Sequence, residues 1–295
     1  MKLVVRHRTE FRYARPVSQA TSQVCLLPRD TPTQRCLSAR LEIDPGPDAV
    51  ARSTDRFGNA VARFGIDRPH ARAAITATST VETADAPPPL PPSPPVARAR
   101  AALGACTGPE ALLAEDCLLA SRYVPVDPAA DALIDELAPG DASALEYAEA
   151  LSGHIFRTFG YDPAFSTVAT PLAEVVRERK GVCQDFAHAA ILVLRRLGVP
   201  ARYVSGYLET RPPPGQRKLR GADASHAWFG VHVPGHGWHD FDPTNDCRPD
   251  GRYVTTAWGR DYGDVAPLRG VVYGGGEHRL AVEVDVDRVE PDAGS

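Results

Sequence analysis

The sequence lacks four features that would each assign it to a familiar class. No apolar run approaches the ~20 residues of a membrane-spanning helix, and the first residues lack the apolar core of a signal peptide. The six cysteines include no Cys-x-x-Cys pair, which removes the usual zinc signature. The net charge of −4 gives no case for nucleic-acid binding. We therefore expect a cytoplasmic protein that binds neither membrane nor nucleic acid and that needs no metal or cofactor.

The composition is that of an ordinary globular protein, and it changes along the chain. With 295 residues, 43% hydrophobic and 24% charged, the chain can form two modest domains. We predict a β-rich N-terminal domain at 1–85, a proline-rich linker at 86–96, a core at 97–290 and a disordered tail at 291–295. The linker suits either a stiff spacer or a docking site for a proline-reading partner.

Local patterns predict the elements of the two domains. Short alternating stretches in the first domain predict the strands of a small sandwich or barrel: Lys2–Tyr13, Gln23–Leu27, Leu37–Ile43, Ala60–Ile66 and Ala73–Val81. A hairpin turn is expected at Arg56–Asn59. After the linker the periodicity becomes helical, at Gly108–Ala120, Pro128–Leu137 and Ala142–Phe159. Asp127 and Asp141 are the expected N-caps of the last two helices.

Cys183 stands out because of its place at the predicted start of a helix. Gly181 ends the preceding helix, and apolar residues then recur at helical spacing until Gly198 and Pro200. Backbone N–H groups in a first helical turn have no intrahelical partner, so they favour a thiolate and can hold an oxyanion. The other five cysteines fit small buried hydrophobes with free thiols.

A base for this thiol must come from elsewhere in the chain. His188 lies five residues on, roughly 140° around the same helix, and so points away from Cys183. His226 is the better candidate, because it opens a predicted strand that a turn connects to an antiparallel return. Strand alternation places Asp240 and Asp242 on one face of that return, so either carboxylate could orient the histidine.

Other residues allow a functional and a structural interpretation. His232, His236 and His239 lie around a turn, so they fit turn and strand positions better than a metal site. Two tryptophans in the same hairpin fit packing on the sheet, with shielding of His226 as the alternative. The stretch Thr210–Asp223 fits either a solvated insertion or a lid over the site.

Three core motifs together resemble the transglutaminase-like superfamily, and most closely its bacterial branch. They are Gly181-Val-Cys-Gln-Asp-Phe-Ala-His188, Ser225-His-Ala-Trp228 and Gly237-Trp-His-Asp-Phe-Asp-Pro-Thr-Asn245. Further stretches look like that branch's β-rich N-terminal domain and C-terminal segment: His7–Tyr13, Leu27–Arg29, Thr54–Asn59, Pro69–His70 and Gly259–Gly270. The resemblance thus covers nearly the whole chain.

The resemblance implies an α+β fold and a catalytic triad. The fold would be a papain-like, transglutaminase-like core, with the cysteine helix packed on an antiparallel sheet, preceded by the β-rich sandwich or barrel. Carried over by position, Cys183 would be the nucleophile, His226 the general base and acid, and Asp242 the orienting carboxylate. Arg260, Asp261 and Tyr262 would frame the cleft.

The resemblance leaves the reaction open among several chemistries. We expect a cysteine-dependent enzyme that acts on peptide or carboxamide bonds of a peptide or protein substrate through a thioester. We favour hydrolysis over cross-linking, because the sequence shows no acidic calcium site like those of the animal cross-linking enzymes and carries an extra β-domain. The alternatives are a protein-glutamine amine transferase and a catalytically silent peptide-binding scaffold.

Overall fold

The long strand β1 (Lys2–Val24) is the centre of the N-terminal sheet in the computed structural model, which describes residues 1–210, 221, 223 and 225–289. Its first half pairs with β5 on one edge and β13 on the other, and its second half pairs with β4 and β12. All seven strands pair in antiparallel fashion, with β2 beside β5 and β3 beside β4. The other six strands are β2 (Gln34–Asp44), β3 (Val50–Thr54), β4 (Ala60–Ile66), β5 (His70–Thr83), β12 (Leu268–Gly274) and β13 (His278–Arg288).

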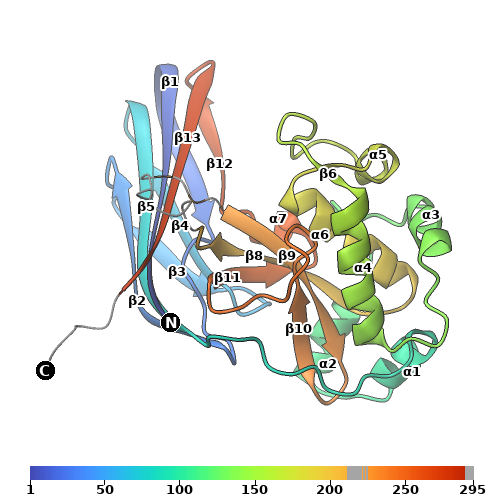
Figure 1. Cartoon of the computed structure of the whole chain (residues 1–295). Coiled ribbons are helices and arrows are strands. Elements are labelled where there is room, and N and C mark those ends of the chain that lie inside the picture. Colours follow the sequence, from blue (N-terminus) through green and yellow to red (C-terminus); the bar gives the residue numbers. More distant parts are fainter. Residues whose placement is uncertain (211–220, 222, 224, 290–295) are drawn as a thin grey trace, which may run out of the picture.

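This sheet differs from the sequence prediction in two respects. The stretches Lys2–Tyr13 and Gln23–Leu27 were expected as separate strands, but β1 continues through a bulge between Arg12 and Val17. The assignment of 97–290 to the core is also wrong for β12 and β13, which lie in the N-terminal sheet (Figure 1). The free edge of β1 has unpaired backbone N–H and C=O groups, which these distant strands satisfy. No local pattern encodes a pairing between the two ends of a chain.

The core is a four-stranded antiparallel sheet with helix α6 (Cys183–Arg196) packed on one face. The strand order is β10-β9-β8-β11. Figure 1 shows this layer beside the N-terminal sheet, with the helices gathered on the side away from that sheet. The four strands are β8 (Ala201–Leu208), β9 (Ser225–Val233), β10 (Gly237–Phe241) and β11 (Tyr253–Gly259). The predicted hairpin, with a strand from His226, a turn at Gly235–Gly237 and an antiparallel return, is confirmed.

Three helices pack against α6 and complete the main hydrophobic core. They are α3 (Ala129–Glu136), α4 (Ala144–Thr158) and α5 (Leu172–Glu178). Pro128, not Asp127, is the N-cap of α3, although the Asp127 carboxylate accepts from Ala129 N–H, and Ser143, not Asp141, caps α4 in a capping box with Glu146. The remaining short elements are η1 (Val96–Arg98), α1 (Ala99–Gly104), α2 (Pro109–Asp116), β6 (Gly160–Tyr161), β7 (Lys180–Gly181) and α7 (Tyr262–Val265). In the described part of the chain, no helix is long and apolar enough to cross a membrane.

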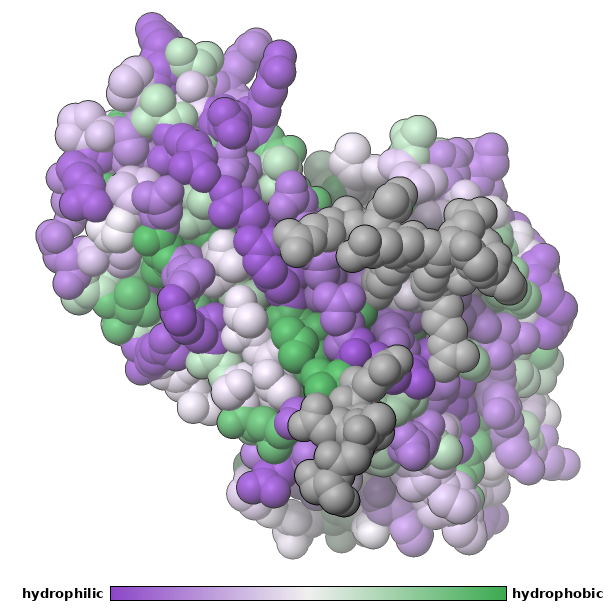
Figure 2. Space-filling view, turned by 60° about the vertical axis from the view of Figure 1, so that its left-hand side comes forward, coloured by the Kyte–Doolittle hydropathy of each residue, from purple (hydrophilic) through white to green (hydrophobic). Residues whose placement is uncertain are grey.

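The proline-rich segment 86–95 runs along the core without helix or strand. Pro94 O accepts from Ala144 N–H, and Pro88 O accepts from the Arg248 guanidinium. Figure 2 shows a mostly hydrophilic surface, with hydrophobic patches on the N-terminal sheet and in the recess between the two halves of the molecule.

Two amide side chains join the N-terminal sheet to the edge strand β11. Asn59 donates from Nδ2 to Trp258 O (2.8 Å) and accepts from Trp258 N–H at Oδ1 (3.0 Å). Gln34 makes the same double contact with the backbone of Thr255, at 2.8 Å for both bonds. Each amide therefore mimics a neighbouring strand, and β11 needs no further partner at these two positions.

We expect Asn59→Ala to lower the free energy of unfolding by about 2–4 kcal/mol. Asn59 is fully buried, so its removal leaves the N–H and C=O of Trp258 without partners. Urea denaturation measures the change, with the exposed amide Gln19→Ala as a control that should stay within about 0.5 kcal/mol. A loss below about 1 kcal/mol for Asn59→Ala would show that the amide contacts do not hold the two sheets together.

Candidate active site

The thiol of Cys183 lies at the first position of α6, where the sequence places it. Helix α5 ends at Arg179, which has a left-handed φ of 52°, and the chain then forms the short parallel pair β6–β7 before Val182 caps α6. The Asp185 carboxylate accepts from Val182 N–H (2.9 Å) and from the Ser166 hydroxyl (2.5 Å). A Cβ on Gly181 would lie 2.5 Å from Asp185 Oδ2, so only glycine fits there. These contacts fix the start of the helix around the thiol.

His226 and Asp242 meet at the open end of the β9–β10 hairpin, away from its turn. His226 is the second residue of β9, and Asp242 follows the last residue of β10. His226 Nε2 lies 2.7 Å from Asp242 Oδ2, and Asp242 is fully buried. Of the two aspartates that alternation allowed, the structure brings Asp242 to the imidazole. Asp240 instead accepts from Trp228 Nε1–H at 3.1 Å and pairs with Arg202 at 3.3 Å.

The charge on His226 is stabilised by its neighbours. Burial alone would lower the pKa of His226, but hydrogen bonds with Asp242 and with Cys183 outweigh it and raise the pKa to about 10. Burial acts to raise the pKa of Asp242, yet its hydrogen bond with His226 is among the contacts that lower it overall. Both shifts favour an imidazolium–carboxylate pair. Since Nε2 faces Asp242, Nδ1 is the ring nitrogen left for the Cys183 sulfur.

Sequence reasoning missed two residues that hold Asp242. Asn245 donates from Nδ2 to Asp242 Oδ2 at 2.7 Å, and the Tyr253 hydroxyl donates to the same oxygen at 2.7 Å. The backbone N–H of Thr244 donates to Oδ1 at 2.8 Å. Asn245 follows Asp-Pro-Thr directly, so its proximity could have been inferred. Tyr253 comes from β11 and gives no local signal in the sequence.

We expect Tyr253→Phe to reduce the turnover of the proposed reaction about tenfold, because one charge-assisted hydrogen bond to Asp242 is lost. The substitution keeps the ring, which packs against Trp228 with centroids 5.4 Å apart. Steady-state kinetics would measure the change, and Tyr273→Phe, on an exposed side chain of β12, is the matched control. Unchanged turnover in Tyr253→Phe would contradict a role for this hydroxyl in positioning the carboxylate.

The other histidines singled out from the sequence lie away from Cys183. His188 is buried on α6, where its Nε2 accepts from Tyr262 N–H and its ring stacks on Tyr123; burial lowers its pKa. His232 contacts Glu110 and the ring of Trp238. Among the residues that the structure describes, no group of three or more His, Cys, Asp or Glu side chains is arranged to hold a metal ion. The stretch Thr210–Asp223, for which the sequence allows a solvated insertion or a lid, lies almost wholly outside the described residues.

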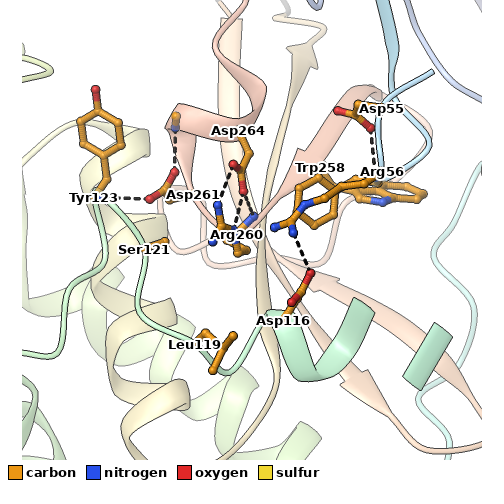
Figure 3. Close-up of polar contacts among 12 residues, drawn as sticks. Asp55, Arg56, Asp116, Leu119, Ser121, Tyr123, Trp258, Arg260, Asp261 and Asp264 are labelled. Atoms are coloured by element: carbon orange, nitrogen blue, oxygen red, sulfur yellow. Dashed lines mark hydrogen bonds and ion pairs between the residues drawn. The ribbon is translucent and has the colours of Figure 1, made fainter. Parts of the chain in front are cut away.

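The C-terminal segment Gly259–Gly270 connects to the helix that carries Cys183. Asp261 caps α7 through Gly263 N–H and accepts from Tyr123 N–H at 2.7 Å, and Arg260 pairs with Asp264 (Figure 3). In the same view Arg56 of the β3–β4 turn reaches Asp116 of α2, at 3.1 Å. Through Tyr262 and Tyr123 this segment contacts His188 of α6.

Comparison with known proteins gives two family matches and several relatives. Residues 3–82 match the bacterial transglutaminase-like N-terminal region, and residues 131–243 match the transglutaminase-like superfamily. An uncharacterized protein of Mycobacterium tuberculosis is 38% identical over 98% of this chain and 93% of its own length. A protein-glutamine gamma-glutamyltransferase of Pseudomonas aeruginosa is 33% identical over 162 residues, which are 50% of this chain and 24% of that protein.

A solved structure confirms the fold class. A protein of Cytophaga hutchinsonii, described as a candidate cysteine protease, superposes with a TM-score of 0.75 at 21% identity, over 99% of this chain and 92% of its own. The expected α+β fold, with a transglutaminase-like core behind a β-rich N-terminal part, is therefore correct. The family matches cover both halves that the sequence motifs indicated. The chain belongs to the transglutaminase-like superfamily, a family of cysteine-based enzymes, and carries that superfamily's bacterial N-terminal region.

Proposed function

We propose that the protein is a thiol acyl-transfer enzyme in which Cys183, His226 and Asp242 act as nucleophile, general acid–base and orienting carboxylate. One observation carries the proposal: an imidazole with a strongly raised pKa, bonded to a buried carboxylate at 2.7 Å, interacts with a thiol at a helix N-terminus. Covalent acyl transfer requires a nucleophile hydrogen-bonded to a base, and a base hydrogen-bonded to a group that orients it.

The proposed reaction has two halves. The Cys183 thiolate attacks a carbonyl carbon of a peptide or carboxamide, and the oxyanion is held by the backbone N–H of Cys183. The His226 imidazolium gives its proton to the leaving amine or ammonia, which leaves a thioester. Neutral His226 then takes a proton from a water molecule while the water oxygen attacks the thioester carbon. The carboxylic acid and the Cys183 thiolate are released. Asp242 fixes the tautomer and stabilises the imidazolium in both halves.

We propose hydrolysis as the main outcome, because water is an acceptor that needs no binding site of its own. Transfer to an amine is the second candidate, and the likeness to the Pseudomonas aeruginosa protein-glutamine gamma-glutamyltransferase favours it. The first half-reaction is the same for both. They differ only in which nucleophile reaches the thioester.

Mass spectrometry of a glutamine-containing peptide pool would test the proposal and separate the two outcomes. The pool is incubated with the protein and with Cys183→Ala, each with and without a small primary amine. Cleaved or deamidated peptides present only with the unaltered protein would support hydrolysis, and amine adducts would support transfer. Identical product profiles for the two proteins would count against acyl transfer and for the scaffold alternative.

A further inference from the structure

A cavity of about 490 Å³ lies on the face of the core sheet opposite α6. The reverse face of the sheet forms its floor, with Arg202, Trp238, Asp240 and Trp258. Its walls come from the linker, the loop before β2 and the turn after β10, and include four prolines: Pro32, Pro87, Pro88 and Pro249. Neither Cys183 nor His226 lines it, and its size lies within the range of small-molecule sites.

Arg202 is buried in this floor with most of its hydrogen-bonding capacity unused. The residue is 5% exposed, and its guanidinium lies between two indoles, 4.5 Å from the centroid of Trp238 and 3.8 Å from that of Trp258. It makes one long contact, from Nη2 to Asp240 Oδ1 at 3.3 Å, and within the described residues its Nε–H has no acceptor. A guanidinium carries five N–H donors, and a buried cation in this state is costly unless a partner is supplied.

Arg248 adds a second cation to the wall of the same cavity. Its Nη2 donates to Pro88 O at 2.7 Å, its Nε–H is buried without an acceptor, and the described residues offer it no ion pair. The acidic residues of the lining are compensated or solvated. Asp240 contacts Arg202, Asp250 pairs with Arg252 at 3.0 Å, and the Glu110 side chain is 63% exposed at the rim. Once the Arg202–Asp240 and Arg252–Asp250 pairs are set aside, Arg248 is the buried cation of the lining that has no ion pair among the described residues.

We propose that this cavity binds a small organic carboxylate with a flat or apolar body. Its carboxylate would accept hydrogen bonds from Arg202 and Arg248, since guanidinium groups recognise carboxylates with planar, paired donors. Its body would lie against the prolines and tryptophans, which offer apolar surface without a competing polar group. The site is separate from the proposed triad.

The wall of this cavity also reaches the triad through one residue. Tyr253 lines the cavity and donates its hydroxyl to Asp242 Oδ2. A ligand bound in the cavity can therefore affect the position of the catalytic carboxylate through a single side chain.

Tryptophan fluorescence gives a direct test, because all three tryptophans of the chain lie at or beside the cavity. Trp238 and Trp258 line it, and Trp228 donates to Asp240. Benzoate is titrated into Cys183→Ala, so that no acyl chemistry contributes, and the neutral analogue benzamide is titrated in parallel. We expect a saturable change with a midpoint below about 1 mM for benzoate and at least about tenfold weaker binding of benzamide.

Two substitutions in the Cys183→Ala background locate the binding. Arg248→Gln removes a lining charge and keeps a donor for Pro88 O, and we expect at least about fivefold weaker binding of benzoate. Arg177→Gln, on a side chain of α5 that is 68% exposed, should bind as the parent does. Arg202→Gln is left out because its removal would strand Asp240 in the floor.

A titration with peptides distinguishes a small-molecule carboxylate from a peptide C-terminus as the ligand. A short apolar peptide with a free C-terminus is compared with its amidated form. If the free peptide binds better than the amidated one but more weakly than benzoate, the site is assigned to small molecules. If the free peptide binds more tightly than benzoate, the site is assigned to peptide C-termini. No saturable change with either carboxylate would overturn the proposal. So would equal binding of benzoate and benzamide, or unchanged binding in a folded Arg248→Gln.

Discussion

Cys183→Ala is expected to abolish the proposed peptide or amide turnover, with a loss on the order of 10⁵–10⁶-fold in kcat. The variant keeps the fold, because Cys183 is half-buried at the start of α6 and alanine is the best helix former. The oxyanion donor and His226 stay in place, but the sulfur that attacks the carbonyl carbon is missing. The loss should appear in kcat, with substrate binding retained.

The control for this substitution is Cys106→Ala, which removes another half-buried free thiol. Its activity should equal that of the unaltered protein. Product formation is followed by mass spectrometry in the peptide pool. Residual activity in Cys183→Ala above about 1% would mean that the thiol is not the nucleophile.

Asp242→Asn is expected to lower kcat by about 10³–10⁴-fold, because an amide cannot hold the imidazole in the required tautomer or stabilise its charge. The same change should lower the pKa of His226 from about 10, since the hydrogen bond with Asp242 is the largest influence that raises it. NMR titration of the imidazole measures that shift independently of any substrate. Asp240→Asn, two residues away on the same hairpin, should leave the titration of His226 near its original value.

The raised pKa of His226 also gives stability a predictable pH dependence. The folded-state pKa of about 10 lies above the ordinary 6.5, so the imidazolium stabilises the fold fully below pH 6.5. This contribution is lost as the pH rises from about 6.5 to 10. Urea denaturation across that window should show falling stability in the unaltered protein and a weaker dependence in Asp242→Asn. An equal slope in both would contradict the assigned pair.

The candidate nucleophile and base of the site could be predicted from local sequence, whereas the residues that position them could not. Gly181 and the helical periodicity after Cys183 place the thiol at a helix start, and the turn at Gly235–Gly237 returns the strand with Asp240 and Asp242 alongside the strand of His226. Each signal is local, since the first runs from Gly181 to Pro200 and the second from His226 to Asp242. Tyr253 reaches Asp242 from a different strand, and alternation alone could not choose between Asp240 and Asp242.

The fold was predictable up to the pairings between distant segments. Local patterns predicted most strands and helices and the family resemblance implied the α+β class, but β12 and β13 join β1 from the far end of the chain, in pairs from Val24–Leu268 to Leu3–Arg288. Likewise, Asn59 and Gln34 hold β11 through side-chain amides, which leave no periodic pattern. Non-local pairing depends on which free edges remain after the local elements form, and sequence periodicity carries no information on that choice.

The rate of alkylation of each cysteine tests the assignment of Cys183 as the nucleophile without the need for a substrate. Burial raises the pKa of Cys25 to about 12 and of Cys117 to about 11, and the pKa values of Cys36 and Cys247 are raised as well. Iodoacetamide is applied at about pH 6, and peptide mass spectrometry follows all six thiols.

We expect Cys183 to be modified at least about 100-fold faster than the others, and His226→Ala to remove most of this advantage. We attribute this advantage to His226 as the proposed base for the thiol. Slow, uniform labelling of all six cysteines, or fast labelling of Cys183 that persists in His226→Ala, would contradict the proposed nucleophile and base.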